Sequence, residues 1–569
     1  MSNNNTNKTN RRLNSFLSFG IFLIILVLLN VAGSFVFKRF DLTTDHRYSL
    51  NEFSKKQLSE LDDIVFLRIY LDGDLPAGFK QLQNSTKEIL DEMRVYAGNN
   101  LQYEFIDPSK SPDQKIRQNI YKELSRKGLK YSNLTSRDGD KTSEQIIFPG
   151  AILAYREQEY PIQLLKNTMG TDPNVMLNNS IQQLEYEISS AIKKAMNLVP
   201  KKIAFIKGHG EASKMELQSI SRSFGEFYQY SDVTINGQVN ALSGYHAAII
   251  VGPDSAISEK DKYVLDQFVM NGGKTMWFIE NAQINTDSLQ KNGISLGLAV
   301  DNNLNDQLFK YGARVNSDFV MDIQSLPRSV VTGYIGDQPK LELISWYYFP
   351  LIFSSVKHPI TNNLDAIATS YIGSIDTVGG KGIKKTPLLF TSKYSKVTNV
   401  PTRVALNILR DPPDERRFNK GAQMVGVLLE GKFESVFKNR ISDKIATNPE
   451  FKFKESSEFN KMIVVSDADI IKNTVNANGS EFYPLGYYRY TKRVYGNTEF
   501  ILNSINYLLD DDNLIFSRVK EFKLRMLNTQ LIAKEKKKWQ IFNTAIPISF
   551  IILIGAIVGY LRRKKYSSH

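Results

Sequence analysis

Two uncharged apolar segments, one near each end of the chain, limit the possible folds more than any other feature. They cover residues 16–37 and 541–561. A helix of about 20 apolar residues is long enough to cross the ~30 Å hydrocarbon core of a bilayer. The sequence therefore predicts two transmembrane helices, which would place both tails on one side of a membrane and the long region between them on the other.

The direction of insertion follows from the lengths of the parts, because basic residues flank both segments on both sides. Short basic tails resist translocation, whereas long domains cross a membrane largely regardless of charge. The apolar core of the first segment is also longer than the roughly 7–15 residues of a cleaved signal peptide. We therefore expect a two-pass protein of the bacterial inner membrane with cytoplasmic tails, residues 1–15 and 562–569, and a large periplasmic region.

The net charge of +13 is concentrated beside the two apolar segments. The first 39 residues carry five Lys or Arg and no acid, and residues 534–569 carry eight Lys or Arg against one Glu. Juxtamembrane Lys and Arg contact lipid headgroups, so membrane lipids are expected partners. The rest of the chain is close to neutral, which argues against nucleic-acid binding.

The chain contains no cysteine. Disulfides, thiolate nucleophiles and cysteine-ligated zinc sites are therefore all excluded.

Residues 41–198 alternate strand and helix patterns in the order βαβαββα, which is that of a thioredoxin-like domain. Within this range, the spacing from Ser49 to Glu52 predicts a capping box, and residues 135–144 are predicted to form a polar loop. A redox role would need a CxxC motif, so only the scaffold can be shared.

A second α/β pattern covers residues 200–322 and resumes at 460–515. Its buried-type strands and intervening helices are typical of a doubly wound sheet of the flavodoxin-like or amidotransferase-like kind. Residues 323–459 break into short strand-like runs and are predicted to be a β-rich insertion. Residues 516–540 are predicted to form a stalk helix leading to the second membrane segment.

The first candidate site is His209, Gly210 and Glu211, which follow a predicted strand where doubly wound domains place ligands. A His and a Glu two residues apart could perform acid–base chemistry, or line a binding crevice. A Gly-His-Gly turn also arises where the backbone needs positive φ. All three interpretations remain open at this stage.

The second candidate site is Ser466, Asp467 and Asp469, which also follow a strand. Paired carboxylates supply the oxygen ligands that divalent cations prefer, but capping of the local backbone is the simpler expectation. We predict no metal, cofactor or catalytic residue. A P-loop needs a glycine five residues before its Gly-Lys pair, and Phe268 occupies that position before Gly273-Lys274. ATP hydrolysis is therefore not expected.

Gly555 and Gly559 form a GxxxG pattern in the second apolar segment. Such a pattern allows another membrane helix to approach closely, so these glycines are predicted to pack against a partner subunit.

Several short motifs occur in a fixed order along nearly the whole chain. They are Phe40-Asp41-Leu42-Thr43, Arg47-Tyr48-Ser49-Leu50, Gly208-His209-Gly210-Glu211, Gly252-Pro253, Gly272-Gly273-Lys274, Val465-Ser466-Asp467-Ala468-Asp469, Gly496-Asn497, Asn503-Ser504-Ile505-Asn506-Tyr507-Leu508 and Trp539. Together these motifs resemble the GldG family of gliding-motility-associated ABC transporter auxiliary proteins. The resemblance implies a non-catalytic membrane subunit that works with a separate permease and ATPase and is linked to gliding and its secretion machinery.

Three functional hypotheses follow. The first is an ABC-transporter auxiliary subunit whose periplasmic region binds a substrate or an envelope partner. The second is a periplasmic scaffold that couples the inner membrane to motility or secretion machinery. The third is an envelope hydrolase or transferase that uses the side chains of His209, Glu211, Asp467 or Asp469.

Overall fold

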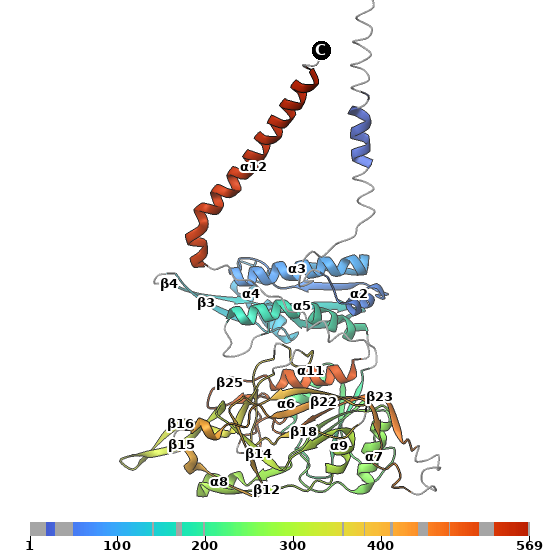
Figure 1. Ribbon diagram of the computed structural model, residues 1–569, viewed down its shortest axis with the longest axis vertical. Helices are drawn as coiled ribbons and strands as arrows, with labels where there is room; N and C mark the ends of the chain where they lie inside the picture. Colours follow the sequence, from blue (N-terminus) through green and yellow to red (C-terminus); the bar gives the residue numbers. More distant parts are fainter. Residues whose placement is uncertain are drawn as a thin grey trace, which may run out of the picture. The chain divides into compact units, whose positions relative to one another are not determined.

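The computed structural model shows a mixed α/β protein with two compact units, Met1–Lys520 and Glu521–His569 (Figure 1). The structure describes residues 17, 19–28, 49–138, 141–166, 173–196, 200–354, 358–362, 364–380, 382–409, 413–441, 453–476, 478–510 and 529–566.

The first domain of the larger unit is built on a four-stranded sheet of order β2-β1-β5-β6. Strands β1 and β2 run parallel, and the other neighbours run antiparallel. The elements in chain order are α2 (Glu52–Ser59), β1 (Val65–Ile69), α3 (Ala77–Ala97), η1 (Gly98–Asn100), β2 (Leu101–Phe105), α4 (Gln114–Arg126), β3 (Ser132–Asp138), β4 (Lys141–Ile147), β5 (Gly150–Tyr155), β6 (Gln158–Gln163) and α5 (Pro173–Met196).

Helix α3 shows why this chain folds onto the sheet. Its buried residues Leu82, Leu90 and Met93 recur at helical spacing and therefore share one face. That face packs with α5 and with the inward side chains of β1 in a single hydrophobic core. Helix α4 contributes Leu124 to a separate, smaller core.

Two local predictions in this domain are wrong. The expected polar loop at 135–144 is a hairpin of β3 and β4, paired from Ser132 with Ile147 onwards. These two strands pair only with each other. A two-stranded hairpin of this kind does not need the alternating apolar residues by which a strand is recognised in a sequence. Its polar residues therefore predicted a loop. Helix α2 is capped by the side chain of Asn51, which accepts from the Phe53 N–H at 2.9 Å, and not by Ser49.

The second domain contains a seven-stranded sheet of order β19-β22-β23-β10-β9-β7-β8. From β23 to β8 all neighbours are parallel, and β22 and β19 are antiparallel additions at one edge. The strands are β7 (Lys202–Lys207), β8 (Gln229–Thr234), β9 (Ala247–Val251), β10 (Lys274–Phe278), β19 (Lys384–Phe390), β22 (Met424–Glu434) and β23 (Ser456–Val465).

Helices cover both faces of this sheet, as the predicted doubly wound pattern requires. Helices α6 (Gln218–Gly225) and α11 (Asn497–Leu509) share one core with Ile203 and Phe205 of β7, whereas α7 (Glu259–Met270) and α9 (Asn305–Tyr311) share the other core with Ala204 and Ile206. Successive residues of a strand point to opposite faces. A strand buried on both faces is therefore apolar throughout.

The range 323–459, expected to be a β-rich insertion, contributes β19 and β22 to the main sheet. An apolar run such as the one in β22 indicates a strand but not its partner, so the sequence did not show this pairing. The remaining elements form small sheets and turns. They are β11 (Ala282–Ile284), α8 (Thr286–Asn292), β12 (Ile294–Ala299), β13 (Ala313–Val315), β14 (Asp318–Asp322), β15 (Ser325–Ile335), β16 (Gln338–Ile352), β17 (Ile367–Ala368), β18 (Ile375–Thr377), β20 (Ser395–Asn399), β21 (Thr402–Ala405), η2 (Leu406–Leu409), η3 (Glu415–Arg417), β24 (Tyr487–Tyr488) and β25 (Arg493–Val494).

The C-terminal unit contains the long helix α12 (Thr529–Tyr566), which includes the predicted segment 541–561. Its portion Glu535–Lys564 is the one helix among the described residues that is long and apolar enough to cross a membrane. Of the predicted first segment, 16–37, residues 19–28 form a shorter apolar helix, and all others except Leu17 lie outside the described residues. The two-pass architecture is therefore not established by the structure. Residues 516–528 of the predicted stalk also lie outside the described part.

Candidate functional site

Both sequence-predicted sites lie where parallel strands of the main sheet end. His209 follows β7, and Asp467 follows β23. The carboxyl ends of parallel strands meet at one edge of a sheet, and ligands of doubly wound domains bind at that edge. The order β8-β7-β9-β10-β23 places the reversal of strand order between β7 and β9, so His209 lies at the topological switch point.

The His209 ring is held between two carboxylates. Its Nδ1 lies 3.1 Å from Glu211 Oε1, and its Nε2 lies 3.0 Å from Asp261 Oδ2 on α7. The His209 backbone N–H also donates to Glu211 Oε2 at 2.7 Å. Both ring nitrogens are thus engaged, and the ring is buried. In this arrangement neither nitrogen is available to take a proton from a substrate.

The electrostatics of this first cluster are balanced. The hydrogen bond to Glu211 is the main cause that raises the pKa of His209, and the bond to Asp261 adds to it while burial opposes both. Burial acts to raise the pKa of Glu211, but the hydrogen bonds from His209 outweigh it and lower that pKa. A positive ring between two negative groups is a structural clasp that joins the loop after β7 to α7.

Backbone geometry explains the glycines around His209. Gly208 has a φ of +120° and Gly210 a φ of +77°. A Cβ at Gly210 would lie 1.5 Å from Asp254 Oδ1. Only glycine combines this backbone conformation with so close an approach.

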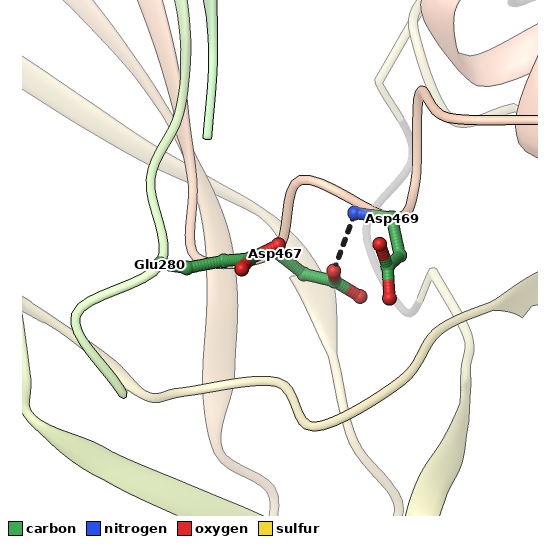
Figure 2. Close-up of side chains that lie close together, drawn as sticks. All are labelled: Glu280, Asp467 and Asp469. Carbon is green, nitrogen blue, oxygen red and sulfur yellow. Dashed lines mark hydrogen bonds between the residues drawn. The ribbon is translucent and has the colours of Figure 1, made fainter. Parts of the chain in front are cut away.

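The second cluster brings together Glu280, Asp467 and Asp469, whose carboxylate oxygens lie within 4.8 Å of one another (Figure 2). The Asp469 N–H donates to Asp467 Oδ1 at 2.7 Å, as the dashed line in Figure 2 shows. The N–H of Ser370 donates to Asp467 Oδ2 at 3.2 Å, and the Ser370 hydroxyl donates to Asp469. Local backbone groups therefore satisfy much of this acidic loop.

Lys472 supplies positive charge to these three carboxylates. Its Nζ lies 3.4 Å from Glu280 Oε1 and 3.6 Å from Asp469 Oδ1. Although burial opposes it, the charges of Asp469 and Glu280 raise the pKa of Lys472. Burial, followed by the charges of Asp469 and Glu280, raises the pKa of Asp467 well above its usual range.

Three carboxylates are the oxygen donors that a hard divalent cation prefers. The Lys472 ammonium ion already provides a positive charge beside two of them. Asp467 is fully buried, and burial raises its pKa, which disfavours the ionised carboxylate that a cation needs as a ligand. This donor set can therefore be explained as an internal ion-pair network.

Ser466 does not join the acidic cluster through its side chain. Its hydroxyl donates to the backbone carbonyls of Gly373 and Val425 at 2.6 and 3.2 Å. It ties the end of β23 to two neighbouring segments.

Sequence reasoning missed Glu280 and Asp261. Glu280 follows β10 closely, as Asp467 follows β23, so a comparison of strand ends could have paired them. Asp261 lies inside α7 and is three residues after the N-cap Ser258, to which its backbone N–H donates at 3.2 Å. No spacing signal in the sequence links Asp261 to His209.

Gly555 and Gly559 lie on α12 with open space around them. A Cβ at either position would meet nothing within 4 Å. Residues four apart share one face of a helix, so the two glycines form a flat strip on that face.

Comparisons with known proteins identify the family. A domain of unknown function matches residues 44–154. A solved structure, the mmIFT52 N-terminal domain, is 12% identical and has a TM-score of 0.32, covering 55% of this chain and 99% of its own. That similarity is too low to indicate a shared fold. A search of curated proteins finds no match.

The model of a family described as an ABC-type uncharacterized transport system matches residues 200–504. The match covers the second domain from the start of β7 to within α11. Since it spans more than half of the chain, the protein belongs to this family of ABC-type transport systems.

Proposed function

We propose that this protein is a non-catalytic auxiliary subunit of an ABC transporter linked to gliding motility, and that its periplasmic region binds a substrate or an envelope partner. The family match over residues 200–504 carries the proposal. The GldG resemblance adds the link to gliding. A separate ATPase must drive transport, because Phe268 occupies a position where a P-loop needs glycine.

The geometry of the two clusters supports a role without catalysis. A general base needs a nitrogen or oxygen within reach of a substrate proton. Both nitrogens of His209 contact carboxylates, and Asp467 is buried beneath hydrogen bonds from its own loop and from Ser370. These features argue against the envelope hydrolase hypothesis.

Helix α12 supports the proposed membrane anchoring. Lys536–Lys538 and Arg562–Lys565 flank its apolar stretch and would set its depth at the two headgroup layers. We infer that residues 16–37 form the second anchor, that both tails are cytoplasmic, and that the protein lies in the bacterial inner membrane. The strip formed by Gly555 and Gly559 is the proposed contact with a permease helix.

We further propose that residues 41–198 form a thioredoxin-like scaffold without redox activity. The sheet order β2-β1-β5-β6, with one parallel pair, supports this interpretation. The role of the domain would be binding, because the chain has no cysteine.

The dependence on ATP hydrolysis separates this proposal from the scaffold hypothesis. The experiment replaces the Walker A lysine of the partner ATPase in cells that contain this protein. An auxiliary transport subunit predicts the same motility defect as deletion of this protein. Normal motility with an inactive ATPase would favour the scaffold and overturn the transport proposal.

A further inference from the structure

A large cleft lies beside the hairpin of β15 and β16. Its volume is about 1400 Å³, which exceeds the roughly 300–1,000 Å³ of typical small-molecule pockets. Seven consecutive residues of β15, from Arg328 to Tyr334, border it. The hairpin itself projects from the second domain (Figure 1).

The cleft borders both the outer strand β15 and one face of the hairpin. Consecutive residues of β15 line it, together with Glu342 and Ile344, which are two residues apart on β16 and therefore share a face. The sheet order is β15-β16-β17, so β15 pairs on one side only among the described strands. Its other edge therefore presents backbone donors and acceptors along the cleft.

Irregularities limit the usable length of this edge. Pro327 lies near the start of β15, and register shifts occur between Ser325 and Pro327 and between Val331 and Gly333. Prolines and bulges are devices that protect edge strands from open-ended pairing. The regular stretch between them, 328–331, is long enough for a short segment of another chain.

Tyrosines from the loop around β24 and β25 form another part of the lining. They are Tyr483, Tyr487, Tyr488 and Tyr490. The rings of Tyr483 and Tyr487 stack with centroids 5.3 Å apart, and the Tyr488 hydroxyl donates to the Pro327 carbonyl at 2.5 Å. Tyrosine offers a large contact area at low entropic cost and is enriched at binding surfaces.

Tyr371, which also lines the cleft, has an unusual backbone conformation. Its φ is +53°, which is strained for a bulky residue and persists only where the surroundings enforce it. Its N–H donates to the Tyr348 carbonyl at 2.7 Å, and its hydroxyl accepts from Trp346 Nε1 at 3.3 Å. The preceding residue, Ser370, is anchored by the acidic cluster. Strain of this kind clusters at functional sites.

The charge of the lining favours an acidic occupant. Arg328 and Arg489 line the cleft against a single acid, Glu342. A polypeptide segment with an acidic residue would complement this excess.

We propose that the cleft binds an extended, acidic peptide segment of a partner protein, which adds a strand to the free edge of β15. Backbone hydrogen bonds to β15 provide affinity, and the tyrosines and arginines read alternate side chains, as in other cases of strand addition. The inference deepens the proposed function, on which it rests, by naming the chemistry of the envelope partner.

The experiment uses the full-length protein in detergent and a phage-displayed library of random peptides of about ten residues. Selected sequences are synthesised, and their affinity is measured by fluorescence anisotropy. The test variant is Tyr483→Ala with Tyr487→Ala. The matched control is Tyr394→Ala, which changes a tyrosine that is 38% exposed and lies outside the lining. We expect a loss of affinity of about tenfold or more in the test variant and little change in the control.

N-methylation of single peptide amides provides a test that does not depend on folding of a variant. Strand addition predicts that methylation weakens binding at alternate residues only, because successive amides point to opposite sides of a strand. Uniform sensitivity, failure to select any peptide, or binding of maltoheptaose in place of peptides would overturn the inference.

Co-purification with a permease and ATPase distinguishes the two proposals. The Tyr483→Ala/Tyr487→Ala variant should retain that association while losing the peptide. If the unmodified protein associates with the permease and ATPase but binds no selected peptide, only the cleft proposal is overturned, whereas absence of association in the unmodified protein overturns the transport role.

Discussion

The His209 cluster and the acidic cluster of Glu280, Asp467 and Asp469 occupy the same edge of one parallel sheet. They differ in how far their positive and negative charges balance. In the first, the His209 ring lies between two carboxylates, and its two ring nitrogens contact them at ordinary hydrogen-bond distances of 3.1 and 3.0 Å. In the second, three carboxylates share a single lysine at 3.4 and 3.6 Å.

The pKa shifts express this difference. The pKa of His209 rises and that of Glu211 falls, so both groups are stabilised in their charged forms. The pKa values of Asp467 and Glu280 rise, so burial and mutual repulsion outweigh their favourable contacts. Two strand ends at the same edge of the sheet therefore differ in their electrostatics. The groups around His209 favour their charged forms, whereas burial and repulsion disfavour the charged forms of Asp467 and Glu280.

The largest expected effect comes from Lys472→Met, which removes the only positive partner of the acidic cluster among the described residues. Lys472 and Glu280 are mostly shielded from solvent, with side chains 19% and 28% exposed. Removing the cation leaves poorly solvated carboxylates without a counter-charge, so we expect a loss of about 3 kcal/mol in the free energy of unfolding at pH 7. Urea titration followed by tryptophan fluorescence measures this loss, because Trp277 and Trp346 are both fully buried in the folded protein. The loss should shrink at lower pH, since protonation of the carboxylates relieves the repulsion.

Two further variants serve as controls for Lys472. Lys472→Arg keeps the charge and should lose much less stability. Lys310→Met breaks an exposed ion pair with Glu434 and should cost no more than about 1 kcal/mol. Equal losses of stability in Lys310→Met and Lys472→Met would contradict the claim that Lys472 offsets repulsion among the three carboxylates.

The next effect concerns His209→Ala, which leaves Glu211 and Asp261 facing each other. Hydrogen bonds to charged groups contribute about 1.5–3 kcal/mol, so we expect a loss of about 2 kcal/mol near pH 6. The folded-state pKa of His209 is raised above its usual 6.5. Its contribution is therefore complete below about pH 6.5 and disappears as the pH rises through the folded-state value.

The pH dependence of the difference between the native protein and His209→Ala is the decisive measurement. Urea titrations between pH 6 and pH 9 should show the difference narrowing toward high pH. The neutral variant His209→Gln should show no such titration. A difference that stays constant, or grows with pH, would mean that the ring is not held as a cation.

The smallest effects come from glycine substitutions, which test the backbone conformation next to His209. Gly210→Ala combines positive φ with a contact on Asp254, whereas Gly244→Ala has positive φ at +80° and open space. We expect a loss of about 1 kcal/mol for Gly244→Ala and about 2 kcal/mol for Gly210→Ala in thermal unfolding. Equal losses would show that Asp254 moves aside without cost.

Much of the main sheet could be predicted from the sequence because its central strands are short, apolar and bounded by turn residues. Strand β9 begins and ends where its apolar run does, and α7 begins after its Ser258 cap. The position of the candidate residues followed from the same logic, since strand ends in parallel sheets meet at one edge.

The partners of those residues could not be predicted. Whether Glu280 meets Asp467 depends on β10 and β23 being neighbours, which no local pattern encodes. The same holds for β22, whose apolar run predicted a strand but not its place in the sheet. The cleft beside β15 combines an edge strand with a distant tyrosine-rich loop, so it arises only from tertiary folding.

The most direct test of the transport role is co-purification of the native protein from membranes in mild detergent. The account predicts a stable complex that contains a multi-span permease and an ATPase, detectable by mass spectrometry. It also predicts that Gly555→Leu with Gly559→Leu weakens the complex, while Ala556→Leu, one position along the helix from Gly555, does so less. A protein that is isolated without either subunit, even after cross-linking, would contradict the central claim.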